Sequence, residues 1–226
     1  MSAADGQPLP HGYTNRTTAR GGRVTKTYRG PGAVARQQRE ELALRALAAR
    51  LPVATVAESR PRSLVLDRIA GRHGQDLITA GHGDAVMFAL GAILRDVQAI
   101  VPEFYGEFDG SGVLVHGDFG PQNALLAVRN DSVVLLADWE WSTVGSPVND
   151  LAWAEFIVRL HHPADVGSLQ ALFDGYGERP PWDERQAAMT ERATALTAWV
   201  RSWKGDDATS DWDYRLRAIE QWREVT

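Results

Sequence analysis

A polar octapeptide between two apolar runs constrains this chain more than any other feature of its sequence. Residues 116–123 read HGDFGPQN; they follow the apolar run 113–115 and precede the apolar run 124–128. Nearly continuous apolar runs of this kind are typical of strands that are buried on both faces. To leave one strand and enter the next within so short a segment the chain needs a tight loop, and its two glycines and one proline favour such a turn.

Three oxygen-bearing side chains are expected to meet at this loop. Asp118 and Asn123 lie at its two ends, and Asp138 directly follows the next apolar run, 133–137. A hairpin between the second and third strands would bring all three together. Carboxylate and amide oxygens grouped in this way suit Mg²⁺, which prefers oxygen ligands. Taken singly, an Asp and an Asn at these positions more often satisfy backbone N–H groups of the loop; the whole string favours the metal site.

The stretch from Leu114 to Trp153 resembles the aminoglycoside phosphotransferase family. It contains HGDFGPQN, then LLADWEW, then GSPVNDLAW. Choline, homoserine and fructosamine kinases share the architecture of this family, and protein kinases do so more distantly. The resemblance implies an α+β, protein-kinase-like fold of two lobes. The N-lobe would have a small antiparallel sheet and one helix, and the C-lobe would be mainly helical with a catalytic β hairpin.

The resemblance also implies roles for residues of the loop. Asp118 would accept the proton of the substrate hydroxyl as that hydroxyl attacks the γ-phosphate, and Asn123 and Asp138 would hold Mg²⁺ that bridges the phosphates. His116 would support the conformation of the loop rather than move a proton.

Two acidic residues downstream leave alternatives open. Asp150 matches an aspartate that braces the catalytic loop in the family, although it could also cap the helix that we expect to begin near Leu151. Glu140 could make an indirect contact to the metal, or it could be an ordinary polar residue between two tryptophans.

The first third of the chain is expected to form the small sheet. Gly21-Gly22 separates two short runs with β-forming residues, 14–20 and 23–28, which is typical of a hairpin. Further strands are expected at 53–57 and 63–67. The helix between the two pairs is expected to run from about Ala33 to Leu51, where Pro52 stops it.

The remainder is expected to be mainly helical. Because a glycine-bounded segment, Gly71–Gly74, interrupts the strand pattern, we place the N-terminal nucleotide-binding lobe at residues 1–67 and the C-terminal catalytic and substrate-binding lobe at residues 68–226. Helices are expected at about 84–100, 148–160, 165–176, 183–204 and 211–224.

A kinase-like fold needs a cation on a strand and a carboxylate on the following helix to orient it. Lys26 is the only lysine before residue 68. Glu40 lies in the middle of the helical stripe formed by Leu44, Leu47 and Leu51, where an unpaired carboxylate would be costly. We therefore expect a Lys26–Glu40 ion pair; pairing of Glu40 with a nearby arginine is the alternative.

Two further segments complete the expected nucleotide site. Gly12 and Asn15 form a Gly-x-x-Asn turn that resembles the phosphate turn of small-molecule phosphotransferases. Any strand before it must be very short or missing. Backbone groups around Asp67 and Ile69, at the position of the family's hinge, would bind the base of ATP or GTP.

Composition and charge exclude several classes of protein. The chain has 24 Lys and Arg against 29 Asp and Glu, a net charge of −5, which argues against a nucleic-acid partner. No apolar stretch approaches the roughly 20 residues of a membrane span. The absence of cysteine excludes disulfides and thiolate zinc sites, and no secretory signal pattern is present. We expect a cytoplasmic monomer or homodimer without nucleic-acid or membrane partners.

The predicted function is that of an ATP- and Mg²⁺-dependent O-phosphotransferase, a small-molecule kinase. Its acceptor would be a hydroxyl of an amino sugar, an aminoglycoside-like antibiotic or an amino alcohol, and antibiotic resistance is one of the roles left open. A cationic acceptor could contact acidic residues on the last helices, each more typical of a solvated helix surface: Glu155, Asp165, Asp174, Glu178, Asp183 and Glu184.

Two other functions stay open at this point. One is a nucleotide-binding pseudo-kinase that regulates a partner, and the other is a metal-dependent hydrolase or glycosidase that uses Asp118 with Asp138. Protein kinase activity is not expected, because Asp-Trp-Glu replaces Asp-Phe-Gly and the sequence has no Ala-Pro-Glu segment.

Overall fold

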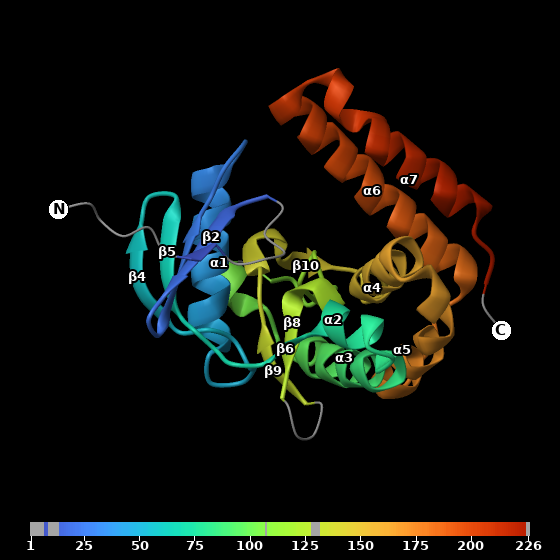
Figure 1. Ribbon diagram of the computed structural model, residues 1–226, viewed down its shortest axis with the longest axis horizontal. Helices are drawn as coiled ribbons and strands as arrows, with labels where there is room; N and C mark the ends of the chain where they lie inside the picture. The colour runs from blue at the N-terminus through green and yellow to red at the C-terminus, as the bar shows by residue number, and fades with distance from the viewer. Residues whose placement is uncertain (1–6, 9–13, 107, 128–131, 225–226) are drawn as a thin grey trace.

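The computed structural model describes residues 7–8, 14–106, 108–127 and 132–224. Figure 1 shows a sheet with one helix on the N-terminal side and a larger group of helices on the C-terminal side. The N-terminal sheet is antiparallel, with the strand order β1-β2-β3-β5-β4. Its strands are β1 (Gln7–Pro8), β2 (Arg16–Arg20), β3 (Arg23–Thr27), β4 (Val56–Arg60) and β5 (Ser63–Asp67).

Helix α1 (Ala33–Leu47) packs against this sheet. Its apolar face, which includes Leu44 and Leu47, is buried. The same face carries Glu40, which is 1% exposed, and strand β3 carries Lys26, which is 3% exposed. Charged groups buried this deeply are stable only when they are paired, so the packing of helix on sheet requires a contact between them.

The C-terminal lobe is mainly helical. Helices α3 (Gly83–Gln98) and α5 (Leu169–Tyr176) pack at very short range. Glycine at position 91 permits this approach, because a Cβ atom there would lie 2.1 Å from the carbonyl oxygen of Leu172. The other helices are α2 (Gly74–Thr79), α4 (Val148–His161), α6 (Trp182–Lys204) and α7 (Ser210–Gln221). Short 3-10 helices are η1 (Glu103–Tyr105), η2 (Pro121–Asn123), η3 (Trp139–Trp141), η4 (Pro163–Ser168) and η5 (Asp206–Thr209).

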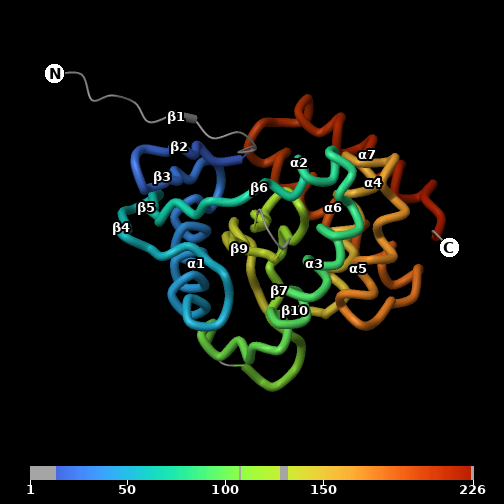
Figure 2. Tube along the Cα trace, turned by 60° about the horizontal axis from the view of Figure 1, so that its bottom comes forward, coloured from blue at the N-terminus to red at the C-terminus, as the bar shows by residue number. Residues whose placement is uncertain are grey.

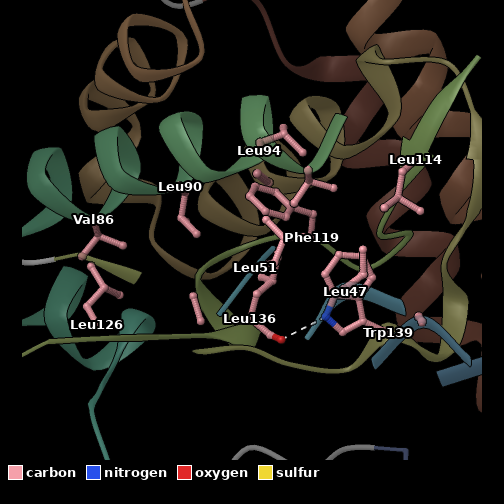
Figure 3. Packing of buried hydrophobic residues seen from close by; sticks show 14 of the residues in the cluster. Leu47, Leu51, Val86, Leu90, Leu94, Leu114, Phe119, Leu126, Leu136 and Trp139 are labelled. Atoms are coloured by element: carbon pink, nitrogen blue, oxygen red, sulfur yellow. Dashed lines mark hydrogen bonds between the residues drawn. The ribbon is translucent and has the colours of Figure 1, made fainter. Parts of the chain in front are cut away.

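Two small sheets hold the polar loop between the lobes (Figure 2). Strand β7 (Val113–Val115) pairs with β10 (Thr143–Gly145), and β8 (Ala124–Leu126) lies between β6 (Arg72–His73) and β9 (Val133–Leu136). The loop therefore leaves one sheet and enters the other. The core beneath it is built from large apolar side chains that no solvent reaches, among them Leu90, Leu94, Phe119, Leu136 and Trp139 (Figure 3).

The expected two-lobed α+β architecture is present, with some local differences. The first helix ends at Leu47 rather than Leu51, because the chain already turns in the residues before Pro52, where helical geometry is disfavoured. The expected helix at 165–176 divides into η4 and α5, and Asp165, inside η4, has non-helical torsion angles. Helix α2 and the short strands β6 and β10 were not predicted.

The division of the chain after Asp67 stays a prediction. Within the described ranges, every helix is too short or too polar to cross a membrane.

Candidate active site

Asp118 lies at the centre of the loop between β7 and β8, held by three side-chain donors. Its Oδ1 accepts hydrogen bonds from Trp153 Nε1 at 2.8 Å and from Gln122 Nε2 at 3.3 Å, and its Oδ2 accepts one from Asn123 Nδ2 at 2.9 Å. Burial raises the pKa of Asp118 to about 6, against the lowering effects of Arg192, Trp153 and Asn123. The side chain is thus a fixed carboxylate with raised proton affinity.

His116 joins this loop to the strand end that carries Asp138. Its Nδ1 accepts the backbone N–H of Asp118 at 3.2 Å, so the proton of a neutral ring lies on Nε2, which donates to the carbonyl oxygen of Ala137 at 2.8 Å. Burial lowers the pKa of His116 to about 4; the Lys26 and Arg192 charges add to this, whereas the Ala137 contact and Asp138 oppose it. The ring is therefore a neutral structural bridge.

This assignment predicts a pH dependence of stability. The unfolded chain binds a proton at His116 near pH 6.5, whereas the folded chain resists protonation until about pH 4, so the stability that neutral His116 contributes is complete above pH 6.5 and is lost as the pH falls to 4. The loss amounts to about 3 kcal/mol. Urea unfolding should show that the free energy of unfolding of the wild type exceeds that of His116→Gln at pH 7, and that this difference becomes smaller by pH 4. A difference that stays constant between the two pH values would contradict a neutral ring.

Asp150, in the first turn of α4, braces the loop through its backbone. Its carboxylate oxygens accept the N–H groups of His116 at 2.7 Å and Gly117 at 2.9 Å. Burial raises the pKa of Asp150 to about 6, against the lowering effect of these two donors. The alternative that it caps the helix is wrong, because α4 begins at Val148, before Asp150, and has no side-chain cap.

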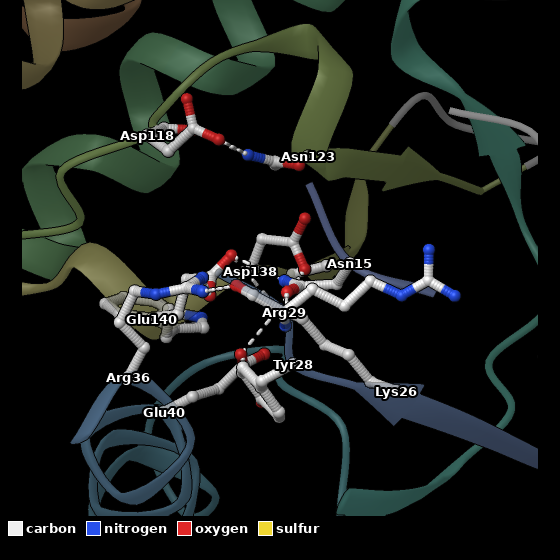
Figure 4. Close-up of polar contacts among 12 residues, drawn as sticks. Asn15, Lys26, Tyr28, Arg29, Arg36, Glu40, Asp118, Asn123, Asp138 and Glu140 are labelled. Carbon is white, nitrogen blue, oxygen red and sulfur yellow. Dashed lines mark hydrogen bonds and ion pairs between the residues drawn. The ribbon is translucent and has the colours of Figure 1, made fainter. Parts of the chain in front are cut away.

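Lys26 joins the two lobes through a pair of carboxylates (Figure 4). Its Nζ lies 2.5 Å from Glu40 Oε2 and 2.6 Å from Asp138 Oδ1. Tyr28 donates its hydroxyl to the same Glu40 oxygen at 2.6 Å. The predicted ion pair with Glu40 is therefore present, and the arginine alternative is wrong. Because Lys26 also pairs with Asp138, residues of both lobes belong to one cluster.

The ionisation of this cluster follows from burial and mutual charge. Burial alone would lower the pKa of Lys26, but Asp138, Glu40 and Glu140 together hold it above its ordinary range. Burial raises the pKa of Glu40 to about 7, and the neighbouring carboxylates add to this against Lys26. Burial would also raise the pKa of Asp138, yet contact with Lys26 keeps it below its ordinary value.

Glu140 lies in η3 and ties the lobes together at a second point. Its Oε1 accepts Asn15 Nδ2 at 2.8 Å, and its Oε2 forms an ion pair with Arg36 of α1. The Arg36 guanidinium also stands over the rings of Trp141 and Trp199, 5.3 and 5.2 Å from their centroids. Because both carboxylate oxygens are engaged, Glu140 acts here as a contact between lobes. Sequence analysis did not identify Arg36 as its partner.

Two adjoining cavities contain the residues predicted to bind nucleotide and metal. The larger, about 780 Å³, is lined by Lys26, Glu40, Asp67, Ile69 and Asp138 together with apolar side chains of both lobes. The smaller, about 70 Å³, is lined by polar groups that include Asn15, Lys26, Asp118, Asn123 and Asp138. Gly12 lies outside the described residues. Lys26 and Asp138 line both cavities and so stand where the two meet.

The small cavity offers oxygen ligands for a divalent cation. Within the described chain, Asn123 Oδ1 and Asp138 Oδ2 carry no hydrogen bond, since Asn123 uses Nδ2 towards Asp118 and Asp138 uses Oδ1 towards Lys26. No group of three His, Cys, Asp or Glu side chains among these residues could hold an ion by itself. This donor set fits Mg²⁺, which binds through one or two carboxylates and completes its coordination with phosphates and water.

The acidic residues considered as acceptor contacts do not gather at Asp118. Glu155 is buried and forms ion pairs with Arg159 and Arg185, so it is neither a solvated charge nor free for a ligand. None of the six lines the small cavity that contains Asp118. The side chains that approach Asp118 from the helical lobe are instead Trp153 and the cation of Arg192.

Comparison with known proteins supports the predicted resemblance. Residues 107–189 match the model of a family described as the phosphotransferase enzyme family. No curated protein matches the chain. Three solved structures with similar folds illustrate the range of neighbours. The gentamicin complex of APH(2″)-IIa has a TM-score of 0.69 at 14% identity, covering 96% of this chain and 91% of that one.

The second is the apoenzyme of macrolide 2′-phosphotransferase MphH from Brachybacterium faecium, with a TM-score of 0.62 at 18% identity and coverage of 96% and 93%. The third is a choline/ethanolamine kinase family protein from Mesorhizobium loti, with a TM-score of 0.66 at 16% identity and coverage of 94% and 86%. These matches confirm the predicted resemblance and the protein-kinase-like fold.

Proposed function

We propose that this chain, a small-molecule kinase by its family match and its fold, transfers the γ-phosphate of ATP to a hydroxyl group of a small acceptor. One observation carries the proposal: Lys26 and Asp138 line both an apolar cavity of nucleotide size and a polar cavity that contains Asp118. A nucleotide that enters the larger cavity would therefore direct its phosphates past Lys26 towards Asp118.

The large cavity supports binding of the base and the phosphates. Apolar side chains such as Val24, Leu66 and Leu136 line it and would enclose the base, with backbone groups around Asp67 and Ile69 at its edge. Lys26 would neutralise phosphate charge, and Glu40 would hold the ammonium group in place. Gly12 and Asn15 are proposed to approach the phosphates from the N-terminal turn.

Asn123 and Asp138 are the residues proposed to hold Mg²⁺. When bound, the ion supplies positive charge that stabilises the phosphate oxygens during transfer. Asp138 has left-handed torsion angles, with φ 67° and ψ 51°, directly after Ala137, and this turn directs its carboxylate away from the sheet towards Lys26.

Asp118 is proposed as the base. As the acceptor oxygen forms its bond to the γ-phosphorus and the bond from that phosphorus to the β-phosphate bridging oxygen breaks, the hydroxyl proton passes to Asp118 and ADP leaves. The raised proton affinity of Asp118 suits this task, because a general base works best with a pKa near the working pH.

The acceptor is proposed to be an amino sugar, an aminoglycoside-like compound or an amino alcohol, and resistance to an antibiotic is one role this chemistry would support. The fold neighbours include structures described with gentamicin and with streptomycin and ATP, and a choline/ethanolamine kinase family protein. A cytoplasmic location and a monomeric or homodimeric assembly belong to the same proposal, with GTP as the alternative phosphate donor to ATP.

The test measures nucleotide binding first and transfer second. Calorimetry with ATP and GTP, with and without Mg²⁺, should show binding that the ion strengthens. ADP release is then followed with gentamicin, kanamycin, choline and erythromycin as separate acceptors, and the product is identified by a mass increase of one phosphate. Nucleotide binding without transfer to any hydroxyl compound in a wider panel would favour the pseudo-kinase; turnover of a phosphate-free substrate without nucleotide would favour a hydrolase.

A further inference from the structure

The contacts of the Asp118 carboxylate are unequal at its two oxygens. Oδ1 accepts from Trp153 Nε1 at 2.8 Å and from Gln122 Nε2 at 3.3 Å, whereas Oδ2 accepts only from Asn123 Nδ2, at 2.9 Å, among the described residues. A carboxylate oxygen has two lone pairs that can accept hydrogen bonds. Both positions on Oδ1 are therefore filled, and one position on Oδ2 is open.

Trp153 is held firmly enough to fix Oδ1. Its side chain is buried, with 4% of the residue exposed, and its ring stacks on Phe156 with centroids 4.4 Å apart and planes inclined by 12°. The guanidinium of Arg192, on α6, stands 5.8 Å from the centroid of the same ring. The indole is thus fixed by its packing before any substrate binds.

Helix α4 holds the loop at two points, and Trp153 is the second. Asp150 binds the backbone N–H groups of His116 and Gly117, while Trp153, three residues later on the same face of the helix, binds the side chain of Asp118. One rigid element therefore sets both the path of the loop and the rotation of the Asp118 carboxylate.

The structure assigns to Trp153 the role of a positioning residue that anchors Asp118 through Oδ1 and leaves Oδ2 as the oxygen that accepts the proton of the acceptor hydroxyl. An indole N–H only donates, so Trp153 cannot compete for that proton. Asn123 can keep its Nδ2 on Oδ2, because the oxygen with which it would hold the ion is its own Oδ1, which carries no hydrogen bond among the described residues. This inference rests on the proposed function for the proton transfer, but the anchoring itself is independent of it.

The first test observes the hydrogen bond directly, without turnover. The chain has eight tryptophans, and Trp153→Phe identifies the Trp153 indole N–H peak in a ¹H–¹⁵N spectrum by its loss. We expect Asp118→Ala to shift this peak further than the other indole peaks and to speed its exchange with solvent. A Trp153 peak that stays in place while others move would overturn the anchoring.

The second test measures its effect on the reaction. Trp153→Phe, and 3-benzothienylalanine at position 153, which keeps the ring shape but replaces N–H by sulfur, should each lower kcat by about tenfold to a hundredfold, with KM for ATP changed by less than about twofold. The acceptor in this assay is the panel compound that gives the fastest ADP release. If no compound gives faster release than the reaction without added acceptor, water serves as the acceptor. Wild-type kcat with benzothienylalanine would overturn the assignment, even if Trp153→Phe fails to fold.

A matched control separates positioning from general loss of structure. Trp182→Phe removes an indole that packs against the same apolar cluster as Trp153 and lies under the guanidinium groups of Arg159 and Arg185, but it is not one of the donors to Asp118, so the change should leave kcat unchanged. If the wild type phosphorylates no hydroxyl compound, the proposed function fails, and the spectrum still decides whether Trp153 anchors Asp118.

Discussion

Asp118→Asn should lower kcat by about two to four orders of magnitude, the range expected when a general base is removed. Asparagine keeps the size of the side chain and an oxygen that can accept from Trp153 Nε1; it loses the acceptor for Asn123 Nδ2, but this group also donates to the backbone carbonyl oxygen of residue 118 at 2.7 Å, so the loop should keep its conformation. It cannot take the proton of the acceptor hydroxyl. Initial rates of ADP release at saturating ATP and acceptor measure the effect, and calorimetry should show nucleotide affinity within about twofold of the wild type.

Asp138→Asn provides the matched comparison. Asp138 lies where the two cavities meet, and its carboxylate contacts Lys26. Because Asp138 is also a proposed ligand of Mg²⁺, loss of its carboxylate should weaken the effect of the ion on nucleotide binding. We therefore expect Asp118→Asn to lower kcat with little change in nucleotide affinity, and Asp138→Asn to change nucleotide binding itself through its dependence on Mg²⁺. If Asp118→Asn abolished nucleotide binding, or if it kept wild-type kcat, the assignment of Asp118 as the base would be wrong.

The Lys26–Glu40 contact could be predicted because its signals are local. A carboxylate at the centre of an apolar helical stripe requires a partner, and only one lysine lies in the neighbouring sheet. The same is true of the hairpin that brings Asp138 towards the loop, because strand periodicity and turn residues are short-range features. The pairing follows from spacing and from the cost of an unpaired buried charge.

The partners of Glu140 could not be predicted in the same way. Arg36 precedes it by more than a hundred residues, as does Asn15, and their contacts exist only after the two lobes have come together. No local window distinguishes Arg36 from the other arginines of the first lobe. Trp153 was a comparable case: its position on α4 was visible, but its bond to Asp118 depends on how the helix packs against the loop.

Short elements of the fold were missed for a related reason. Strand β6 spans only Arg72–His73, and β10 spans Thr143–Gly145; both are defined by pairing with distant strands and not by a pattern of their own. Long amphipathic helices such as α3 carry their pattern within one segment and were found within a few residues of their bounds.

Lys26→Met should destabilise the folded protein by about 3–5 kcal/mol, the usual cost of removing one partner from a buried ion pair. Without the ammonium group, Glu40 keeps only the Tyr28 hydroxyl as a hydrogen-bond partner among the described residues, and Asp138 loses its contact across the lobes. The double variant Lys26→Met/Glu40→Gln should recover much of this loss, because glutamine still accepts from Tyr28 and leaves no buried charge at that position. Both variants should lose nucleotide affinity.

Urea unfolding at neutral pH measures these differences in stability: the midpoint of the transition should shift, while the dependence of the free energy of unfolding on urea concentration stays the same. The control is Arg45→Met on the same helix, which removes the more exposed Arg45–Glu41 pair and should cost less than about 1 kcal/mol. The burial of Lys26 between Glu40 and Asp138 accounts for the difference between the two sites, since a buried charge without a partner cannot be compensated by water. Equal losses for Lys26→Met and Arg45→Met, or simple additivity in the double variant, would contradict this account of how the lobes are joined.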